Sequence, residues 1–328
     1  MQRRQFLRSI ARAASVPLLS PLVPQLAVAQ TAYPSRPVRI IAGFAAGGGV
    51  DITARLIGQW LNERLGQPFV TENRTGADGN IATEAVVNAP ADGYTLLLAT
   101  LPNAVNATLY PNLKFVFLRD MAPIAAVIRV PMVVLVHPSL PAKSIAELIA
   151  YARDNPGKIN MASAGTGSAP HMAGELFNSM AGVNMLHVPY RGQGPALSDL
   201  LGGQVQILFA AAPGTVDYIK TEKLRALAVT SPTDADVLKI LPTIAATLPG
   251  YEASQWYGLA APAKTPADIV ERLNREINAA FADAAMKARF AAISGEPIEG
   301  TSAQFGKLIA DETEKWAKVV KFAGLKVE

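Results

Sequence analysis

The chain of 328 residues contains no cysteine and only three histidines. Without cysteine, disulfide bonds, thiolate metal sites and a cysteine nucleophile are excluded. His137, His171 and His187 are too scattered to give the short ligand spacings of a zinc site. We therefore expect neither a metal nor a cofactor.

Sequence signatures of common enzymes are missing as well. The chain has no Gly-x-Ser-x-Gly nucleophile elbow and no phosphate-binding loop that ends in Gly-Lys-Ser/Thr. Residues 43–48 follow a predicted strand, but Ala45 occupies the second glycine position of the dinucleotide-binding fingerprint. The sequence therefore argues against a catalytic function.

The excess of positive charge is confined to the beginning of the chain. The sequence has 30 Lys and Arg residues against 26 Asp and Glu residues. Arg3, Arg4, Arg8 and Arg12 all precede residue 30, and no acidic residue does, so the remaining 299 residues are formally neutral. A basic surface for nucleic acid is not expected.

The same first segment contains, in the usual order, the parts of an export signal. A twin-arginine pattern at Arg3-Arg4 precedes a moderately apolar stretch, and Ala27-Val28-Ala29 fits the small-x-small cleavage rule. We expect a cleaved signal peptide over residues 1–29 and a periplasmic protein that begins at Gln30. The alternatives are the ordinary secretory route and a disordered basic tail. Later apolar runs fall short of the roughly 20 residues that span a bilayer, so we do not expect a membrane-embedded mature protein.

Alternating strands and helices are predicted along the rest of the chain. Helical spacing begins near Ile52 and ends at Gly66, capping boxes open helices at Ser144 and Thr301, and Thr265 is predicted as an N-cap before Pro266. Short apolar strands are predicted over residues 38–44, 69–71, 94–100, 131–136, 159–161, 185–189, 205–209, 224–229 and 256–260. This alternation favours mostly parallel sheets with helices on both faces.

Two glycine-bearing turns, one in each half of the chain, are the most informative motifs. They are Phe44-Ala45-Ala46-Gly47-Gly48-Gly49 and Ser163-Ala164-Gly165-Thr166-Gly167-Ser168, and each follows a predicted strand and precedes a predicted helix. A helix N-terminus offers free N–H groups and the positive end of the helix dipole, so both turns are suited to an anion. Neither turn contains Lys or Arg. The alternative is that both glycine turns are only tight connections.

At these residues the chain resembles the periplasmic substrate-binding proteins of tripartite tricarboxylate transporters, the Bug receptors. No single motif is diagnostic, but the order and spacing of several short motifs resemble that family over about 230 residues. The matching segments are residues 33–38, 44–51, 72–77, 91–96, 163–171, 188–192, 201–205 and 256–266.

The resemblance implies an α/β fold of two lobes that close on a ligand, a Venus flytrap, with a mostly parallel sheet in each lobe. It also implies that the chain crosses twice between the lobes. We expect residues 30–131 and 256–328 to form lobe 1 and residues 132–255 to form lobe 2. The sequence alone, without the resemblance, favours a simple split near residue 140.

The resemblance further implies a solute receptor rather than an enzyme. Such a receptor binds a small carboxylate and delivers it to membrane transporter subunits, and we expect a monomer. The alternatives are a sensor that docks on a membrane kinase and an exported α/β enzyme that acts on a carboxylate.

The family's carboxylate-binding loops correspond to the two glycine turns. The ligand-binding residues expected from this correspondence, with His171 added as a residue that could reach the cleft, are Phe44, Ala45, Ala46, Gly47, Gly48, Thr100, Ser163, Ala164, Gly165, Thr166 and His171. Some family members carry an acid where this chain has Ala210. Its absence argues against an amino-acid ligand and favours a carboxylate without an amine.

Overall fold

The structure is a computed structural model that describes residues 33–212, 214–232 and 238–326. The signal peptide predicted over residues 1–29 lies outside the described residues. The strands are β1 (Val38–Ala42), β2 (Phe69–Asn73), β3 (Thr95–Thr100), β4 (Met121–Val136), β5 (Asn160–Ser163), β6 (Leu186–Pro189), β7 (Ile207–Ala211), β8 (Arg225–Val229), β9 (Ser254–Pro262) and β10 (Glu296–Pro297).

Helices connect these strands, as the alternating pattern predicts. The α-helices are α1 (Gly49–Leu65), α2 (Asn80–Val87), α3 (Leu101–Leu109), α4 (Phe117–Asp120), α5 (Ile145–Asp154), α6 (Ala169–Ala181), α7 (Gln193–Leu201), α8 (Val216–Lys220), α9 (Ala267–Ala280), α10 (Ala284–Ala292) and α11 (Ser302–Phe322). Two short 3₁₀ turns are η1 (Ala77–Gly79) and η2 (Ile244–Ala246).

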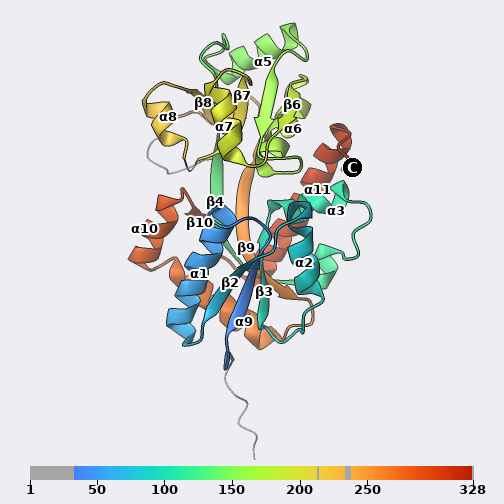
Figure 1. The fold of residues 1–328 in the computed structure, drawn as a ribbon, viewed down its shortest axis with the longest axis vertical. Helices are drawn as coiled ribbons and strands as arrows, with labels where there is room; N and C mark the ends of the chain where they lie inside the picture. The colour runs from blue at the N-terminus through green and yellow to red at the C-terminus, as the bar shows by residue number, and fades with distance from the viewer. Residues whose placement is uncertain (1–32, 213, 233–237, 327–328) are drawn as a thin grey trace, which may run out of the picture. The chain divides into compact units, whose positions relative to one another are not determined.

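The described strands form one curled sheet with two parts, and the order along it is β2-β1-β3-β9-β4-β7-β5-β6 (Figure 1). Strands β2, β1 and β3 are parallel neighbours in one part, and β6, β5 and β7 are parallel neighbours in the other. Strands β4 and β9 run antiparallel to their neighbours. The fold is therefore of the predicted α/β class, with parallel strands grouped on either side of the strands that connect the two parts.

Strand β4 belongs to both parts of the sheet. It pairs with β9 from Met121 to Pro131, with β7 from Met132 to Val136 and with β8 from Val133 to Val136. The sequence predicted only residues 131–136 of it, because proline cannot donate to a ladder and Pro123 and Pro131 interrupt the apolar run. The structure accommodates Pro123 by a register shift next to it, and Pro131 lies where the pairing partners of β4 change.

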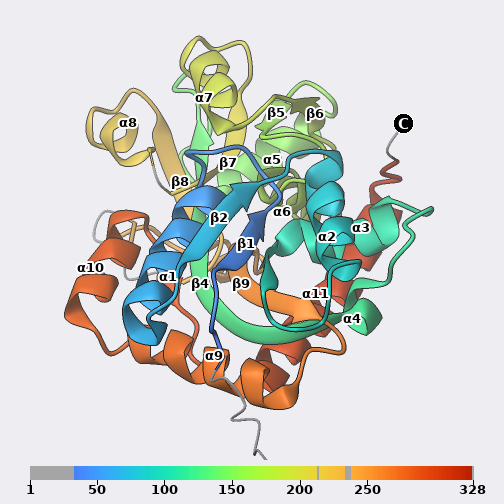
Figure 2. The same ribbon diagram turned by 60° about the horizontal axis from the view of Figure 1, so that its bottom comes forward.

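Helices cover both faces of the sheet. One buried cluster joins Ile57 of α1, Leu273 of α9 and Phe290 of α10 to β1, and another joins α2, α3, α6 and α11 across the opposite face. Figure 2 shows α1 and α11 on opposite sides of the strands. A third cluster packs α7 against the second part of the sheet. Both parts of the sheet therefore bury apolar side chains on two faces.

Local sequence signals define several helix ends. Gly66 ends α1 in the left-handed conformation at φ 72°, and Thr301 and Gln304 form the predicted reciprocal capping box of α11. Ser144 accepts a hydrogen bond from the Glu147 amide, as predicted. The prediction of Thr265 as an N-cap is wrong by one residue. Pro266 is the cap of α9, because its ψ of 138° is still extended.

Candidate functional site

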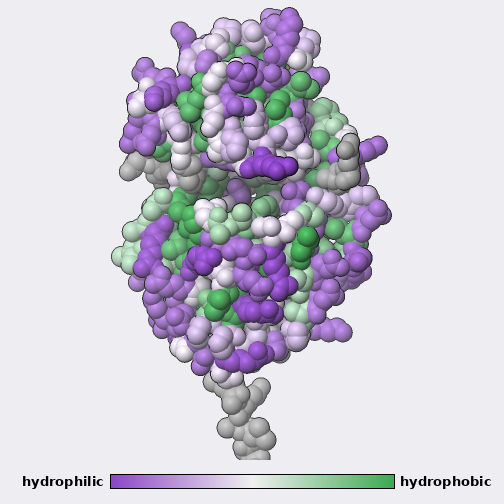
Figure 3. All heavy atoms as spheres, viewed as in Figure 1, coloured by the Kyte–Doolittle hydropathy of each residue, from purple (hydrophilic) through white to green (hydrophobic). Residues whose placement is uncertain are grey.

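The two glycine turns occupy equivalent positions in the two parts of the sheet. The first glycine turn (residues 44–49) leads from β1 into the first residue of α1, and the second glycine turn (residues 163–168) connects β5 to α6. Both follow the carboxyl end of a parallel strand, where ligands bind in open α/β sheets. Figure 3 shows a groove across one face of the molecule, between the part that carries α7 and β6 and the part that carries α1 and α2 in Figure 1.

Side chains of α1 and β2 hold the first glycine turn. Asp51 Oδ2 accepts a hydrogen bond from the Gly47 amide at 2.9 Å, and Asn73 Nδ2 donates to the Phe44 carbonyl at 2.9 Å. Arg55 Nε donates to both carboxylate oxygens of Asp51 at 3.0 Å. The Arg55 hydrogen bond, opposed by burial, lowers the pKa of Asp51 to about 2. Asp51 therefore positions the turn, and the Gly47 amide is already engaged.

Other amides of the first glycine turn are unengaged. Residues 45–49 are exposed, and in the described part of the chain the amides of Ala45, Ala46 and Gly48 have no hydrogen-bond partner. Helix α1 begins without a side-chain cap, so the positive end of its dipole adds to these N–H groups. Phe44 is half-buried at the base of the turn. This arrangement suits an anion without a protein cation.

Tyr257 on β9 brings a hydroxyl to the same helix end, and sequence reasoning missed it. A Cβ atom on Gly49, the first residue of α1, would lie 2.8 Å from Tyr257 Oη. Tyr257 is 3% exposed, and Oη has no hydrogen-bond partner among the described residues although it is not fully enclosed. Burial raises the pKa of Tyr257, so the hydroxyl keeps its proton and remains a donor. The pairing of β9 with β3 brings Tyr257 to this helix end, and no local sequence signal marks it.

The second glycine turn is braced by two stacked histidines. Ser163 Oγ lies 2.6 Å from His187 Nε2 and accepts a hydrogen bond from the Gly165 amide at 3.1 Å. The His171 ring stacks on His187 with ring centres 3.6 Å apart, and His171 Nδ1 accepts a hydrogen bond from the Gly167 amide at 3.0 Å. Burial, reinforced by His171, lowers the pKa of His187 to about 3, so its ring is neutral at physiological pH. Ser163 and His171 thus hold the second glycine turn in place through its backbone amides.

The structure separates the expected site residues into accessible and supporting ones. Ala164, Gly165 and Thr166 are partly exposed, and the Thr166 hydroxyl has no partner within the described ranges. Ser163 and His171 are fully buried. Thr100 is 2% exposed and forms the N-cap of α3, where its amide donates to Asn103 Oδ1 at 2.8 Å. The partly exposed residues of the second glycine turn are therefore the ones that can contact a ligand directly.

The short turn η1 lies between the two glycine turns. A Cβ on Gly79 would lie 3.4 Å from the Phe44 ring, and one on Gly167 would lie 3.6 Å from Asp78 Oδ2. Tyr110 donates a hydrogen bond to the same oxygen of Asp78 at 2.8 Å. The fold thus places an acidic side chain against the second glycine turn, which sequence reasoning missed. The acid within the glycine-rich run Gly76–Gly79 is the local signal that could have pointed to it.

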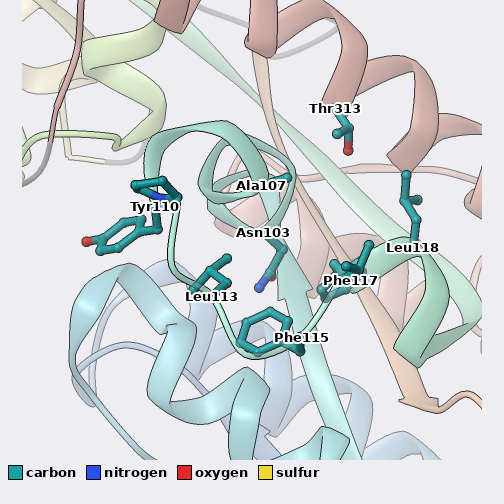
Figure 4. Close-up of a pocket in the computed structure, with 10 residues that line it drawn as sticks. Asn103, Ala107, Tyr110, Leu113, Phe115, Phe117, Leu118 and Thr313 are labelled. Carbon is teal, nitrogen blue, oxygen red and sulfur yellow. The ribbon is translucent and has the colours of Figure 1, made fainter.

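An apolar cavity of about 220 Å³ lies elsewhere, next to α3, α4 and α11. Leu113, Phe115 and Phe117 line it, and the Tyr110 hydroxyl points away from these side chains (Figure 4). Its lining contains none of the expected ligand-binding residues. We therefore assign the candidate site to the glycine turns rather than to this cavity.

The fold is that of a two-lobed periplasmic binding protein. The structure of the periplasmic binding protein BugD is 34% identical and matches with a TM-score of 0.76 over 90% of this chain and 100% of that chain. None of the helices in the described ranges combines the length and apolar character that a membrane crossing requires.

The chain belongs to the tripartite tricarboxylate transporter family of receptors, whose family model matches residues 53–325. Protein BugT of Bordetella pertussis is 38% identical over 304 residues, which are 92% of this chain and 93% of BugT. R. palustris Rpa4515 with adipate is 37% identical and matches with a TM-score of 0.79 over 90% and 99% of the two chains. MatC from Rhodopseudomonas palustris, with bound malate, is 30% identical, with a TM-score of 0.76 over 88% and 100%.

Proposed function

We propose that this protein is an extracytoplasmic solute receptor that binds a small carboxylate and delivers it to a tripartite tricarboxylate-type membrane transporter. The binding role is that of the family, and the site is proposed to bind its ligand without transforming it. Adipate and malate, both dicarboxylates, are bound to the related proteins and support a small carboxylate as the ligand. We propose that the receptor acts as a monomer.

The ligand is proposed to bind between two lobes. Residues 30–131 and 256–328 form lobe 1 in this proposal, and residues 132–255 form lobe 2. The change of partners of β4 after Pro131 and the start of β9 at Ser254 support both boundaries.

The observation that carries this proposal is the pair of glycine turns at equivalent strand ends. The first offers the amides of Ala45, Ala46 and Gly48, and the second offers the Thr166 hydroxyl. Hydrogen bonds to a charged group are stronger than those between neutral groups, so several such donors can hold a carboxylate without a salt bridge. Ser163, His171 and Thr100 are proposed to act by fixing the loops.

Export completes the proposed function. We propose that residues 1–29 are cleaved as a signal peptide and that Arg3-Arg4 directs the twin-arginine route. N-terminal sequencing of the exported protein is expected to begin at Gln30, and replacing both arginines with lysine is expected to block export. A functional protein that begins at residue 1 would contradict the cleavage.

The substitution Gly48→Ala tests the binding site without disturbing the backbone. Gly48 has φ −83° and ψ 169°, which any residue adopts, and a Cβ would lie 3.6 Å from the Ala45 carbonyl oxygen. Alanine is expected to leave the protein as stable or to stabilise it by about 0.4–1 kcal/mol, because it restricts the unfolded chain. The added methyl occupies the exposed side of the turn, so carboxylate affinity is expected to fall by about tenfold, or 1.4 kcal/mol.

A panel of carboxylates in thermal-shift and titration calorimetry identifies the ligand, and native mass spectrometry of protein from the periplasm checks it. Gly194→Ala is the matched control, since Gly194 is exposed on α7 and has open space around it. This control is expected to bind as the unchanged protein does. Carboxylate binding that Gly48→Ala leaves intact would refute the site, and a panel without any binding would refute the function.

A further inference from the structure

A carboxylate without a cationic partner lies next to the proposed site. Asp78 lies in η1, next to Gly167 of the second glycine turn, and the following residue, Gly79, lies next to the Phe44 ring of the first. Its Oδ2 would be 3.6 Å from a Cβ atom on Gly167. The second glycine turn therefore has this acid as a neighbour.

The position of Asp78 is fixed by its surroundings. Its backbone is left-handed, with φ 49° and ψ 42°, a conformation that L-residues seldom adopt. The buried Asn106 donates from Nδ2 to the Asp78 carbonyl at 3.0 Å, and Tyr110 donates to Oδ2 at 2.8 Å. Helix α3 and its C-cap residue Tyr110 thus hold both the backbone and one carboxylate oxygen of Asp78 in place.

The charge of Asp78 is only partly compensated. In the described part of the chain it forms no ion pair, and Oδ1 has no hydrogen-bond partner. Burial raises the pKa of Asp78, and the Tyr110 hydrogen bond opposes that effect. A half-buried carboxylate is costly unless it is paired, so a positively charged group arriving with the ligand would stabilise it.

We propose that Asp78 binds the ammonium group of an amino-carboxylate ligand whose carboxylate is held by the glycine turns. This inference rests on the proposed function and specifies the ligand class. The sequence argued against an amino acid because Ala210 stands where some relatives carry an acid. Ala210 is buried on β7, whereas Asp78 supplies an acid from the opposite part of the fold.

Three four-carbon probes test the proposal by calorimetric titration. L-Aspartate, L-malate and succinate share a dicarboxylate skeleton and carry an ammonium, a hydroxyl and no donor, respectively. Aspartate is expected to bind about tenfold more tightly than succinate, with malate between them, since the ammonium adds a charged hydrogen bond. Asp78→Asn is expected to remove this preference and to leave succinate binding unchanged or stronger.

Two further variants control for folding and for the change of charge. Asp78→Gly is expected to fold, because glycine adopts positive φ readily, and to lose the preference as Asp78→Asn does. Asp154→Asn makes the same chemical change on an exposed acid at the end of α5 and is expected to keep the preference.

The outcomes separate this proposal from the function it rests on. Succinate binding as tightly as aspartate, or an equal loss of both in Asp78→Asn, would overturn the role of Asp78 while leaving a carboxylate receptor. If only a longer carboxylate binds, adipate and 2-aminoadipate form the decisive pair. If no carboxylate of the panel binds, the proposed function fails, and the ligand class fails with it.

Discussion

Removing a single oxygen atom, with the substitution Tyr257→Phe, is expected to weaken carboxylate binding without lowering stability. Tyr257 Oη lies at the N-terminus of α1, 2.8 Å from where Gly49 would carry a Cβ. The hydroxyl has no partner among the described residues, so phenylalanine breaks no hydrogen bond within the described structure. The free energy of unfolding is therefore expected to be unchanged or slightly higher.

The magnitude follows from the charge of the ligand. A hydrogen bond to a charged group contributes about 1.5–3 kcal/mol. The Kd of the carboxylate is therefore expected to increase by a factor of about ten to more than a hundred. Titration calorimetry measures this loss, and thermal or urea unfolding of the ligand-free protein checks the stability. A more stable protein with weaker binding would be unusual for a residue that served packing alone.

Gly49→Ala provides the second half of a double-mutant cycle. Its methyl group would stand 2.8 Å from Tyr257 Oη, so the hydroxyl must move and binding is expected to weaken. In the Tyr257→Phe background that hydroxyl is absent, and the further loss from Gly49→Ala is expected to be smaller. Strict additivity of the two losses, or unchanged affinity in Tyr257→Phe, would refute the placement of this hydroxyl at the ligand.

Two further predictions concern stability. The pKa of Asp51 is lowered from 3.8 to about 2, first by Arg55, so the ionised form stabilises the fold above about pH 4 and this contribution is lost as pH falls from 4 to 2. Linkage between protonation and folding gives a stabilisation of about 2 kcal/mol, which solvent screening reduces to about 1 kcal/mol because Arg55 is half exposed. Asp51→Asn is expected to remove this part of the pH dependence of the free energy of unfolding. Gly258→Ala is expected to destabilise by about 1–3 kcal/mol in urea unfolding, because its Cβ would overlap the Phe305 ring and lie 2.7 Å from the Ala125 carbonyl oxygen. Wild-type stability in Gly258→Ala would contradict the close packing of β9 between β4 and α11.

Sequence reasoning identified most strands, both glycine turns and the caps at Gly66 and Thr301, because each depends on local chemistry. It missed the first half of β4, where Pro123 disrupts a pattern that tertiary pairing restores. Tyr257 and Asp78 were missed for a different reason. Their positions next to the glycine turns depend on contacts between elements far apart in the sequence, which no local pattern encodes.

The comparison of Thr166→Ala with Arg191→Ala by titration calorimetry tests the central claim most directly. The claim is that amides and hydroxyls, rather than a cation, hold the carboxylate. Thr166→Ala is expected to weaken binding by about 0.5–3 kcal/mol, whereas the exposed Arg191 is expected to contribute little. Raising salt from low to physiological strength is expected to change Kd only slightly. Binding that is abolished by Arg191→Ala and untouched by Thr166→Ala would show a salt-bridged anion and contradict the account.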